Sequence, residues 1–234
     1  MLRVLFGEPP RKSEGKLLEA MQAMQRYADL LNKQIAGGRD QDHKLRKYEI
    51  YTLGLISALD ELEQSHYAAS KYGARIKADT VEALTPEERL DYNRYVYFDK
   101  NAFIRVFSLL DKLGTLMNEY LGLQTERVKP HFSYFTVIRG MLHRNLYPEL
   151  NLPLQELKEQ SKPAMNRLRK RRNTEIHFMN SEMQDDLRQS HEDYSEQHQL
   201  EDIAQQVDDM NQMMDLVLNT LKLTFHHAYR QMRK

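Results

Sequence analysis

The stretch "YFDKNAFIRVFSLLDKLGTLMNEYLGL", residues 97–123, decides the fold class of this chain. Its apolar face repeats at alternating spacings of four and three residues, the period of an amphipathic α-helix. The members of this face are Phe103, Phe107, Leu110, Gly114, Met117 and Leu121. Gly122 follows as a typical helix stop. The pattern therefore predicts one long helix, which we expect over residues 86–121.

The start of this helix has its own signal in "LTPEERL", residues 84–90. Thr85 is a good N-cap, and Pro86 suits the first helical position because its missing N–H would have no partner there. Glu88 stands three residues after the cap, the spacing of a capping box. These three residues predict a sharp helix start at residue 86.

Comparable apolar patterns predict further helices on both sides of this one. We expect long helices over 14–36, 40–72, 154–178 and 200–231, with an interruption at Pro163, and a short helix near 131–144. Pro148 and Pro153 are interpreted as bracketing a loop. Long helices with short connections predict an all-α, up-and-down antiparallel bundle of about five long helices. We expect a single helical domain over residues 1–234.

The composition agrees with this fold class and limits the functions. Charged residues make up 29 % of the 234 residues and the hydrophobic set 41 %, enough to bury a core. Nine glycines and seven prolines are too few for the turns of an all-β domain. The net charge of zero gives no global attraction to nucleic acid, so anion binding needs a local patch.

The chain has no cysteine, which excludes disulfides and thiolate metal sites and agrees with a reducing cytosol. No apolar run approaches the roughly 18 residues of a membrane span, and the short semi-apolar start is not a signal peptide. We expect a cytoplasmic protein with no membrane partner.

The histidines and paired acids do not have the spacing of metal ligands. His226 and His227 are adjacent, so their side chains point about 100° apart on a helix. His66 continues an apolar stripe and is interpreted as a core or interface histidine. The pairs Asp185–Asp186 and Asp208–Asp209 are interpreted as solvated acids. We expect no metal and no cofactor.

One stretch carries a functional pattern: "RKRRNTEIHF", residues 169–178. It belongs to a cationic run formed by Arg167, Arg169, Lys170, Arg171 and Arg172. Arg172 is followed by the polar Asn173 and, after three more residues, by His177. Histidine transfers protons near neutral pH, and the planar fork of arginine binds phosphate. RNA carries a built-in nucleophile in its 2′-hydroxyl, so these residue types suit metal-independent RNA cleavage.

The stretch resembles the Arg-polar-x3-His signature of HEPN domains, the higher-eukaryote and prokaryote nucleotide-binding superfamily. Residues 97–123 are similar to the long central helix of stand-alone bacterial HEPN proteins, and the resemblance covers about residues 40–230. It implies a helical bundle, commonly a homodimer with two facing motifs, and in many members a metal-independent endoribonuclease. Carried over by position, Arg172, Asn173 and His177 are the predicted catalytic residues. The predicted substrate-binding residues are Arg167, Arg169, Lys170 and Arg171.

Helix geometry also favours a second subunit. Residues five apart on one straight helix point about 140° apart, so Arg172 and His177 do not share a face. Either Arg172 swings back or a second copy supplies a motif. The seam on the first helix, Leu17 to Ile35, also suggests a homodimer. The expected ligand is single-stranded RNA or a nucleotide.

Two other readings of the cationic run remain. The chain is alternatively a catalytically inactive HEPN module that binds nucleotide or RNA, or a helical protein-interaction bundle. In the last case, the cationic run is a solvated helix end or a partner for the acidic segment 181–202. That segment is either a mobile loop or a solvated helix face.

Overall fold

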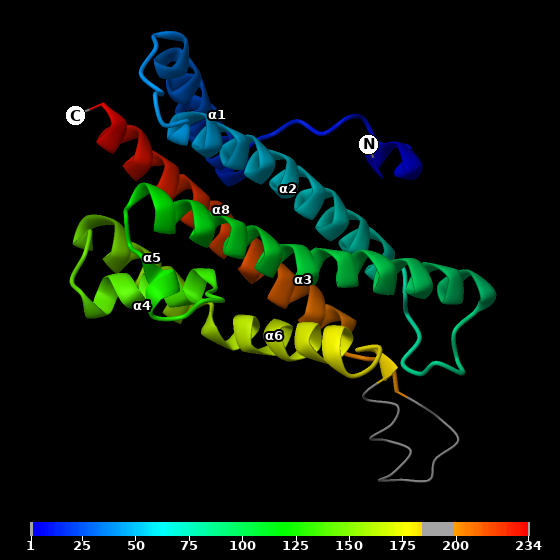
Figure 1. The fold of residues 1–234 in the computed structure, drawn as a ribbon. Helices are drawn as coiled ribbons and strands as arrows, with labels where there is room; N and C mark the ends of the chain where they lie inside the picture. Colours follow the sequence, from blue (N-terminus) through cyan, green and yellow to red (C-terminus); the bar gives the residue numbers. More distant parts are fainter. Residues whose placement is uncertain (1, 184–198, 234) are drawn as a thin grey trace. The chain divides into compact units, whose positions relative to one another are not determined.

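The computed structural model describes residues 2–183 and 199–233. These residues form α-helices and short 3₁₀ turns and contain no strand, which confirms the all-α prediction (Figure 1). A single isolated bridge joins Thr80 to Gln199 within the described chain. The elements are η1 (Leu2–Phe6), α1 (Gly15–Ala36), α2 (Lys44–Gly73), α3 (Pro86–Tyr120), η2 (Thr125–Arg127), α4 (Tyr134–His143), α5 (Pro148–Gln160), α6 (Lys162–His177) and α8 (Ile203–Met232).

The described chain divides into two compact units. Unit 1 comprises residues 1–10, 62–105 and 162–213, and unit 2 comprises residues 11–61, 106–161 and 214–234. Helices α2, α3 and α8 each contribute residues to both units. The expectation of one domain over residues 1–234 stays a prediction.

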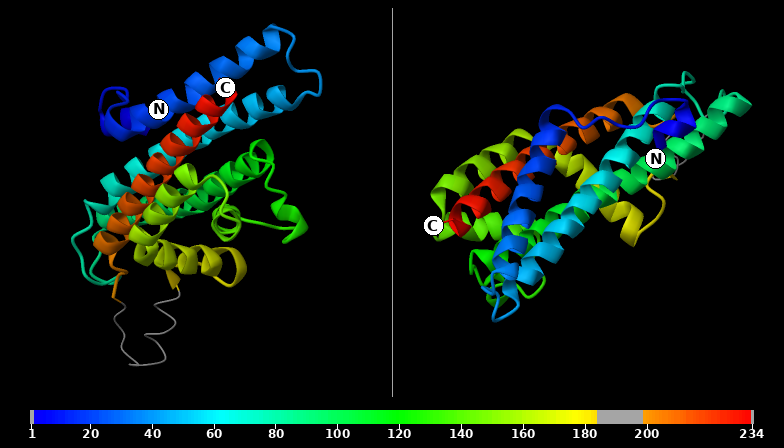
Figure 2. Two further views of the ribbon diagram at one scale, coloured as in Figure 1. Left: turned by 90° about the vertical axis from the view of Figure 1, so that its left-hand side faces the viewer. Right: turned by 90° about the horizontal axis from the view of Figure 1, so that it is seen from above.

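Unit 2 is built around the predicted apolar face of α3. Phe107, Leu110 and Met117 are buried there, as the sequence pattern predicts. The rings of Tyr27 from α1 and Phe225 from α8 pack with centroids 5.5 Å apart. Helix α1 and the unit-2 part of α2 run antiparallel and are joined by a short turn (Figure 2). Apolar burial therefore holds these helices together.

Two of the predicted helix boundaries are confirmed by their hydrogen bonds and backbone angles. The N–H of Glu88 donates to Thr85 Oγ1 at 3.1 Å, and the N–H of Thr85 donates to Glu88 Oε2 at 3.1 Å. This reciprocal pair is the predicted capping box of α3. At the other end, Gly122 has a φ of 62°, a left-handed conformation that glycine adopts without strain. The capping box and Gly122 therefore predicted the start and the end of α3 correctly.

The prediction for residues 148–178 was wrong in two respects. The expected loop between Pro148 and Pro153 is the first part of α5, and the interruption expected at Pro163 lies at Ser161, between α5 and α6. Pro148 is the first residue of α5 and Pro163 the second of α6. Proline costs no hydrogen bond at these positions, because the first N–H groups of a helix have no partner inside it. These prolines start helices rather than end them.

Unit 1 holds α6 against α3 and α8. Ala164, Met165 and Leu168 form the buried face of α6. On the other side of unit 1, Arg3 of η1 pairs with Glu63 of α2 at 2.5 Å, and its guanidinium lies 4.0 Å from the ring centre of Tyr67.

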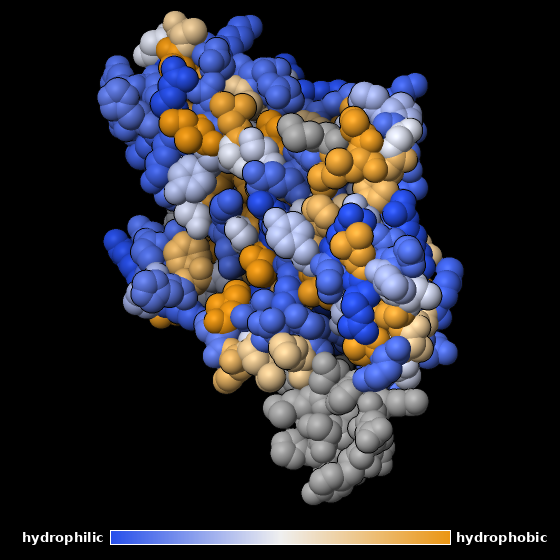
Figure 3. Space-filling view, turned by 90° about the vertical axis from the view of Figure 1, so that its right-hand side faces the viewer, coloured by the Kyte–Doolittle hydropathy of each residue, from blue (hydrophilic) through white to orange (hydrophobic). Residues whose placement is uncertain are grey.

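In the view of Figure 3, apolar side chains are divided into small groups by hydrophilic ones. Such scattered groups are normal on globular proteins and predict no partner by themselves.

Candidate functional site

Helix α6 carries every predicted site residue, and it has two different faces. At 100° per residue, Asn166, Arg169, Lys170, Asn173 and His177 fall within about 100° of each other around the helix. The opposite side carries the buried apolar residues of α6. Each predicted residue is therefore assigned by its angular position either to solvent or to the interior of unit 1.

The first predicted substrate-binding cation, Arg167, is held by a carboxylate of unit 1. Its Nε and Nη2 donate to the two carboxylate oxygens of Asp209 in α8 at 2.8 and 2.6 Å. Asp209 is only 2 % exposed, so the interpretation of the Asp208–Asp209 pair as solvated acids was wrong for Asp209. Arg167 fastens α6 to α8, and its role as a substrate contact stays a prediction.

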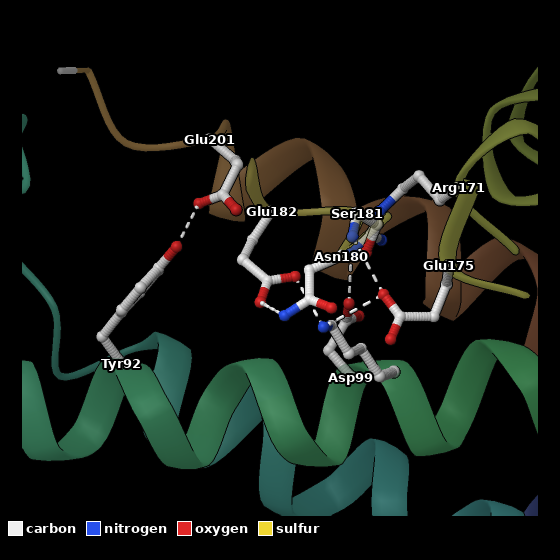
Figure 4. A network of polar contacts seen from close by, with 9 residues as sticks. Tyr92, Asp99, Arg171, Glu175, Asn180, Ser181, Glu182 and Glu201 are labelled. Atoms are coloured by element: carbon white, nitrogen blue, oxygen red, sulfur yellow. Dashed lines mark hydrogen bonds and ion pairs between the residues drawn. The ribbon is translucent and has the colours of Figure 1, made fainter. Parts of the chain in front are cut away.

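Arg171 is held in the same way from α3. Its Nη2 donates to Asp99, which is 1 % exposed, and its guanidinium lies 4.9 Å from the ring centre of Phe103 (Figure 4). Burial lowers the pKa of the Arg171 guanidinium, but the Asp99 carboxylate together with Tyr95 and Glu201 outweighs burial, and the net pKa is raised. Arg171 is therefore a charged anchor between α6 and α3, and its role toward substrate also stays a prediction.

A network of polar contacts continues from this anchor to the end of α6. Lys100 pairs with Glu175 at 3.0 Å and with Glu182 at 2.6 Å, and the N–H of Ser181 donates to Glu175 at 2.9 Å (Figure 4). Burial raises the pKa of Glu175, but the Ser181 N–H and Lys100 outweigh it, so the net pKa is lowered. The end of α6 is thus fixed by charge-assisted hydrogen bonds.

The acidic segment predicted over 181–202 is described only at its two ends. Glu182 pairs with Lys100, and Glu201 accepts a hydrogen bond from the hydroxyl of Tyr92 at 2.9 Å. Asp202 accepts a hydrogen bond from the N–H of Gln205 at 2.8 Å, at the start of α8. Residues 184–198, including Asp185 and Asp186, lie outside the described part. At both ends, acidic side chains hold unit 1 together.

The exposed face of α6 forms an open groove of about 620 Å³. Among the described residues no carboxylate lines this groove, and its lining is Asn166, Arg169, Lys170, Asn173, Thr174 and Phe178. Two of the predicted cations and the predicted polar residue Asn173 are therefore brought together. Such a groove has the charge that a phosphate backbone needs.

The predicted histidine ends this face. His177 is the last residue of α6 and is exposed. Its ring centre lies 6.4 Å from that of Phe178, whose side chain is 82 % exposed and lines the groove. Asn166 and Phe178 were missed as site residues, although an exposed aromatic residue directly after the histidine was a readable signal. Base stacking on exposed aromatic rings is common in single-strand binding.

Arg172 does not join this face. It is partly buried and does not line the groove. Both Arg172 and His177 lie in the continuous helix α6, so the angle of about 140° between them holds. One chain therefore presents Asn173 and His177 outward and turns Arg172 toward the interior side of the helix.

Within residues 2–183 and 199–233, no group of three or more histidine, aspartate or glutamate side chains is arranged to hold a metal ion. None of the helices described has both the length and the apolar composition that crossing a bilayer requires.

The family model described as Cthe2314-like HEPN matches residues 51–229, which is more than half of the chain. The chain belongs to the HEPN family. The match includes all of α6 and nearly all of the resemblance expected over residues 40–230. HEPN proteins are often nucleases or nucleotide-binding proteins. The comparisons with curated proteins and with solved structures gave no match.

Proposed function

We propose that this HEPN protein is a metal-independent endoribonuclease that binds single-stranded RNA on the exposed face of α6. The observation that carries the proposal is the position of Asn173 and His177 with Arg169 and Lys170 on one face of α6, whose groove is lined by no carboxylate of the described residues. The cations supply attraction to phosphate, and the histidine supplies proton transfer.

The chemistry balances without a cofactor. The RNA 2′-oxygen attacks the neighbouring phosphorus, the bond from phosphorus to the 5′-oxygen breaks, and a 2′,3′-cyclic phosphate and a 5′-hydroxyl end result. The 2′-hydroxyl loses a proton and the leaving 5′-oxygen gains one. In the proposal the His177 imidazole carries out one of these proton transfers, while Arg169 and Lys170 stabilise the charge that builds on the phosphate.

Arg172 requires a separate step in the proposal. Because Arg172 points about 140° from His177 on its own helix, either its side chain swings toward the groove or the Arg172 of a second copy, turned out from its helix, reaches the reacting phosphate. We include the second arrangement, a homodimer with facing α6 helices, in which Arg172 of one subunit stabilises the phosphate attacked beside His177 of the other.

A fluorescent single-stranded RNA incubated with the purified protein in EDTA tests the proposal. We expect cleavage products with 2′,3′-cyclic phosphate ends, and no cleavage of DNA of the same sequence, because DNA lacks the 2′-hydroxyl. An RNA with a single 2′-deoxy residue should resist cleavage at that residue alone. Cleavage that EDTA abolishes would overturn the mechanism.

A second candidate function is RNA or nucleotide binding without cleavage. The observation that favours it is the partly buried Arg172, which leaves a single chain without the arginine of its motif on the histidine's face. This function predicts the same RNA affinity as the nuclease and intact RNA in the EDTA assay. The cleavage assay therefore separates the two.

Reversing the charge of the groove tests RNA binding directly. Arg169→Glu together with Lys170→Glu should weaken affinity for single-stranded RNA about 10-fold or more at low salt. Removing each phosphate contact should also reduce the slope of log affinity against log salt by about 0.7. Fluorescence anisotropy across a salt series measures both quantities.

The matched control is Arg127→Glu together with Lys129→Glu, the same charge change at exposed residues of unit 2. This control should bind RNA like the parent apart from a small effect of net charge. Equal affinity of the groove variant and the parent would show that the exposed face of α6 is not the RNA surface.

A further inference from the structure

Unit 2 contains a second pocket, at the C-terminal end of α8. It has a volume of about 550 Å³ and is lined by α1, the start of α5 and α8. Pockets of this size commonly hold small molecules. Four of its lining residues lie outside the family match over residues 51–229, namely Ala23, Arg26, Arg230 and Arg233. The family match therefore covers only part of this pocket.

Three arginines give this pocket its charge. Arg26 comes from α1, Arg230 from the last turn of α8, and Arg233 from the residue just beyond that helix. Within the described part of the chain, no carboxylate pairs with any of the three. The guanidinium of Arg233 lies 5.7 Å from the ring centre of Tyr229, which also lines the pocket. The stacking limits the positions that Arg233 can take.

The acids near these arginines are bound to other partners. Glu149 accepts from the Nε2 of His227 at 3.2 Å, and Glu19 pairs with Lys222 at 2.7 Å. His227 is 3 % exposed, and its Nδ1 lies 3.5 Å from the hydroxyl of Tyr120. The buried His227 thus pairs with the one described carboxylate that lines the pocket, which leaves three arginines against one acid in the lining.

The pKa of His226 reflects the positive charge of the arginines. It lines the pocket while its neighbour His227 is buried, so the two rings point apart as the sequence predicts. Burial lowers the pKa of His226, and Lys222, Arg26 and Arg230 lower it further, with only Glu19 opposing them. Cations lower the pKa of a histidine because they disfavour a further positive charge. A bound anion has the opposite effect.

The rest of the lining is apolar. Ala23 and Leu150 line the pocket but are each only 2 % exposed, whereas Leu223 is partly exposed. The pocket therefore offers both a cluster of guanidinium groups and an apolar surface. Guanidinium groups bind phosphate through paired hydrogen bonds, and an apolar surface favours a ring or a short hydrocarbon part.

We propose that this pocket binds a small phosphorylated molecule whose phosphate contacts Arg26, Arg230 and Arg233 and whose apolar ring lies on Leu223. The site is independent of the proposed RNA groove, because every residue that lines it belongs to unit 2 and every groove residue belongs to unit 1. Loss of one function is therefore expected to leave the other intact.

Isothermal titration calorimetry with phenyl phosphate tests the proposal. Phenyl phosphate should bind to one site, inorganic phosphate more weakly, and neutral phenol not measurably. Arg230→Glu should weaken phenyl phosphate binding about 10- to 100-fold, because it replaces a charge-assisted hydrogen bond with repulsion. The matched control is Arg139→Glu, at an exposed residue of α4 in the same unit, and it should leave the affinity unchanged.

A second measurement follows His226 by NMR titration. Bound phenyl phosphate should raise the pKa of His226, because the phosphate dianion favours the protonated ring. Equal binding of phenol, equal loss in the Arg230 and Arg139 variants, or an unchanged His226 pKa with saturating ligand would each overturn the proposal. The Arg230→Glu variant should also cleave and bind RNA like the parent.

Discussion

His177→Ala should lower the rate of RNA cleavage by about 10² to 10⁴, because it removes the group that transfers a proton to or from the reacting oxygen. His177 is exposed at the last residue of α6, so the change leaves no cavity in unit 1. The variant should keep the parent's RNA affinity and thermal stability, since the groove cations remain and exposed substitutions usually cost less than about 0.5 kcal/mol. Single-turnover cleavage and anisotropy measure the two effects separately.

The control for His177 is His143→Ala. His143 is likewise an exposed histidine at the last residue of a helix, α4, but it lies in unit 2. This variant should cleave RNA at the parent's rate. Asn173→Ala should cost less than His177→Ala, because an amide positions groups and transfers no proton. A His177→Ala protein that cleaves as fast as the parent would rule out the proposed catalytic role.

A mixture of two inactive variants tests the contribution of Arg172. If the site takes Arg172 from one subunit and His177 from the other, an Arg172→Ala chain and a His177→Ala chain form a mixed dimer with one intact site. Mixing them should then restore part of the cleavage activity that each variant lacks. If the mixture stays inactive although mixed dimers form, the two residues do not act across a dimer.

The sequence predicted the elements whose signals are local. The apolar face of α3 and the capping box of Thr85 and Glu88 are both found, because a helix period and a cap depend on residues a few positions apart. The start of α5 was predicted as a loop, and the interruption between α5 and α6 was placed at Pro163 instead of Ser161, because proline is compatible with both a loop and a helix start. The choice depends on packing that the local pattern does not contain.

The sequence predicted which residues form the cationic run, but it did not predict which of their side chains face the interior. The cationic run around Arg169 was readable, yet two of its members face carboxylates that are far away in sequence. Asp99 lies 72 residues from Arg171, and Asp209 lies 42 residues from Arg167. Only the packing of α6 between α3 and α8 decides which cations face inward. The second pocket was missed for the same reason, since α1 and α8 bring Arg26 and Arg230 together.

The other large effect is expected from Asp99→Asn, which should lower the free energy of unfolding by about 3 to 5 kcal/mol. Asp99 is 1 % exposed, and the side chain of its partner Arg171 is 20 % exposed, so the change leaves a largely buried positive charge without its carboxylate. Urea denaturation measures the loss. Arg171→Met combined with Asp99→Leu should recover much of it, because it removes both charges.

Asp209→Asn is the matched control. It removes an equally buried carboxylate whose arginine partner is exposed, so it shows how much of the cost comes from burial of the arginine. Asp209 is 2 % exposed like Asp99, but the side chain of Arg167 is 47 % exposed and is solvated by water when its partner is lost. We expect a smaller loss, about 1 kcal/mol, because water screens the exposed arginine. Equal losses in the two variants would mean that burial of Arg171 does not set the cost. A larger loss for Asp99→Asn would identify the Asp99–Arg171 pair as the contact that fixes α6, and with it the orientation of the groove.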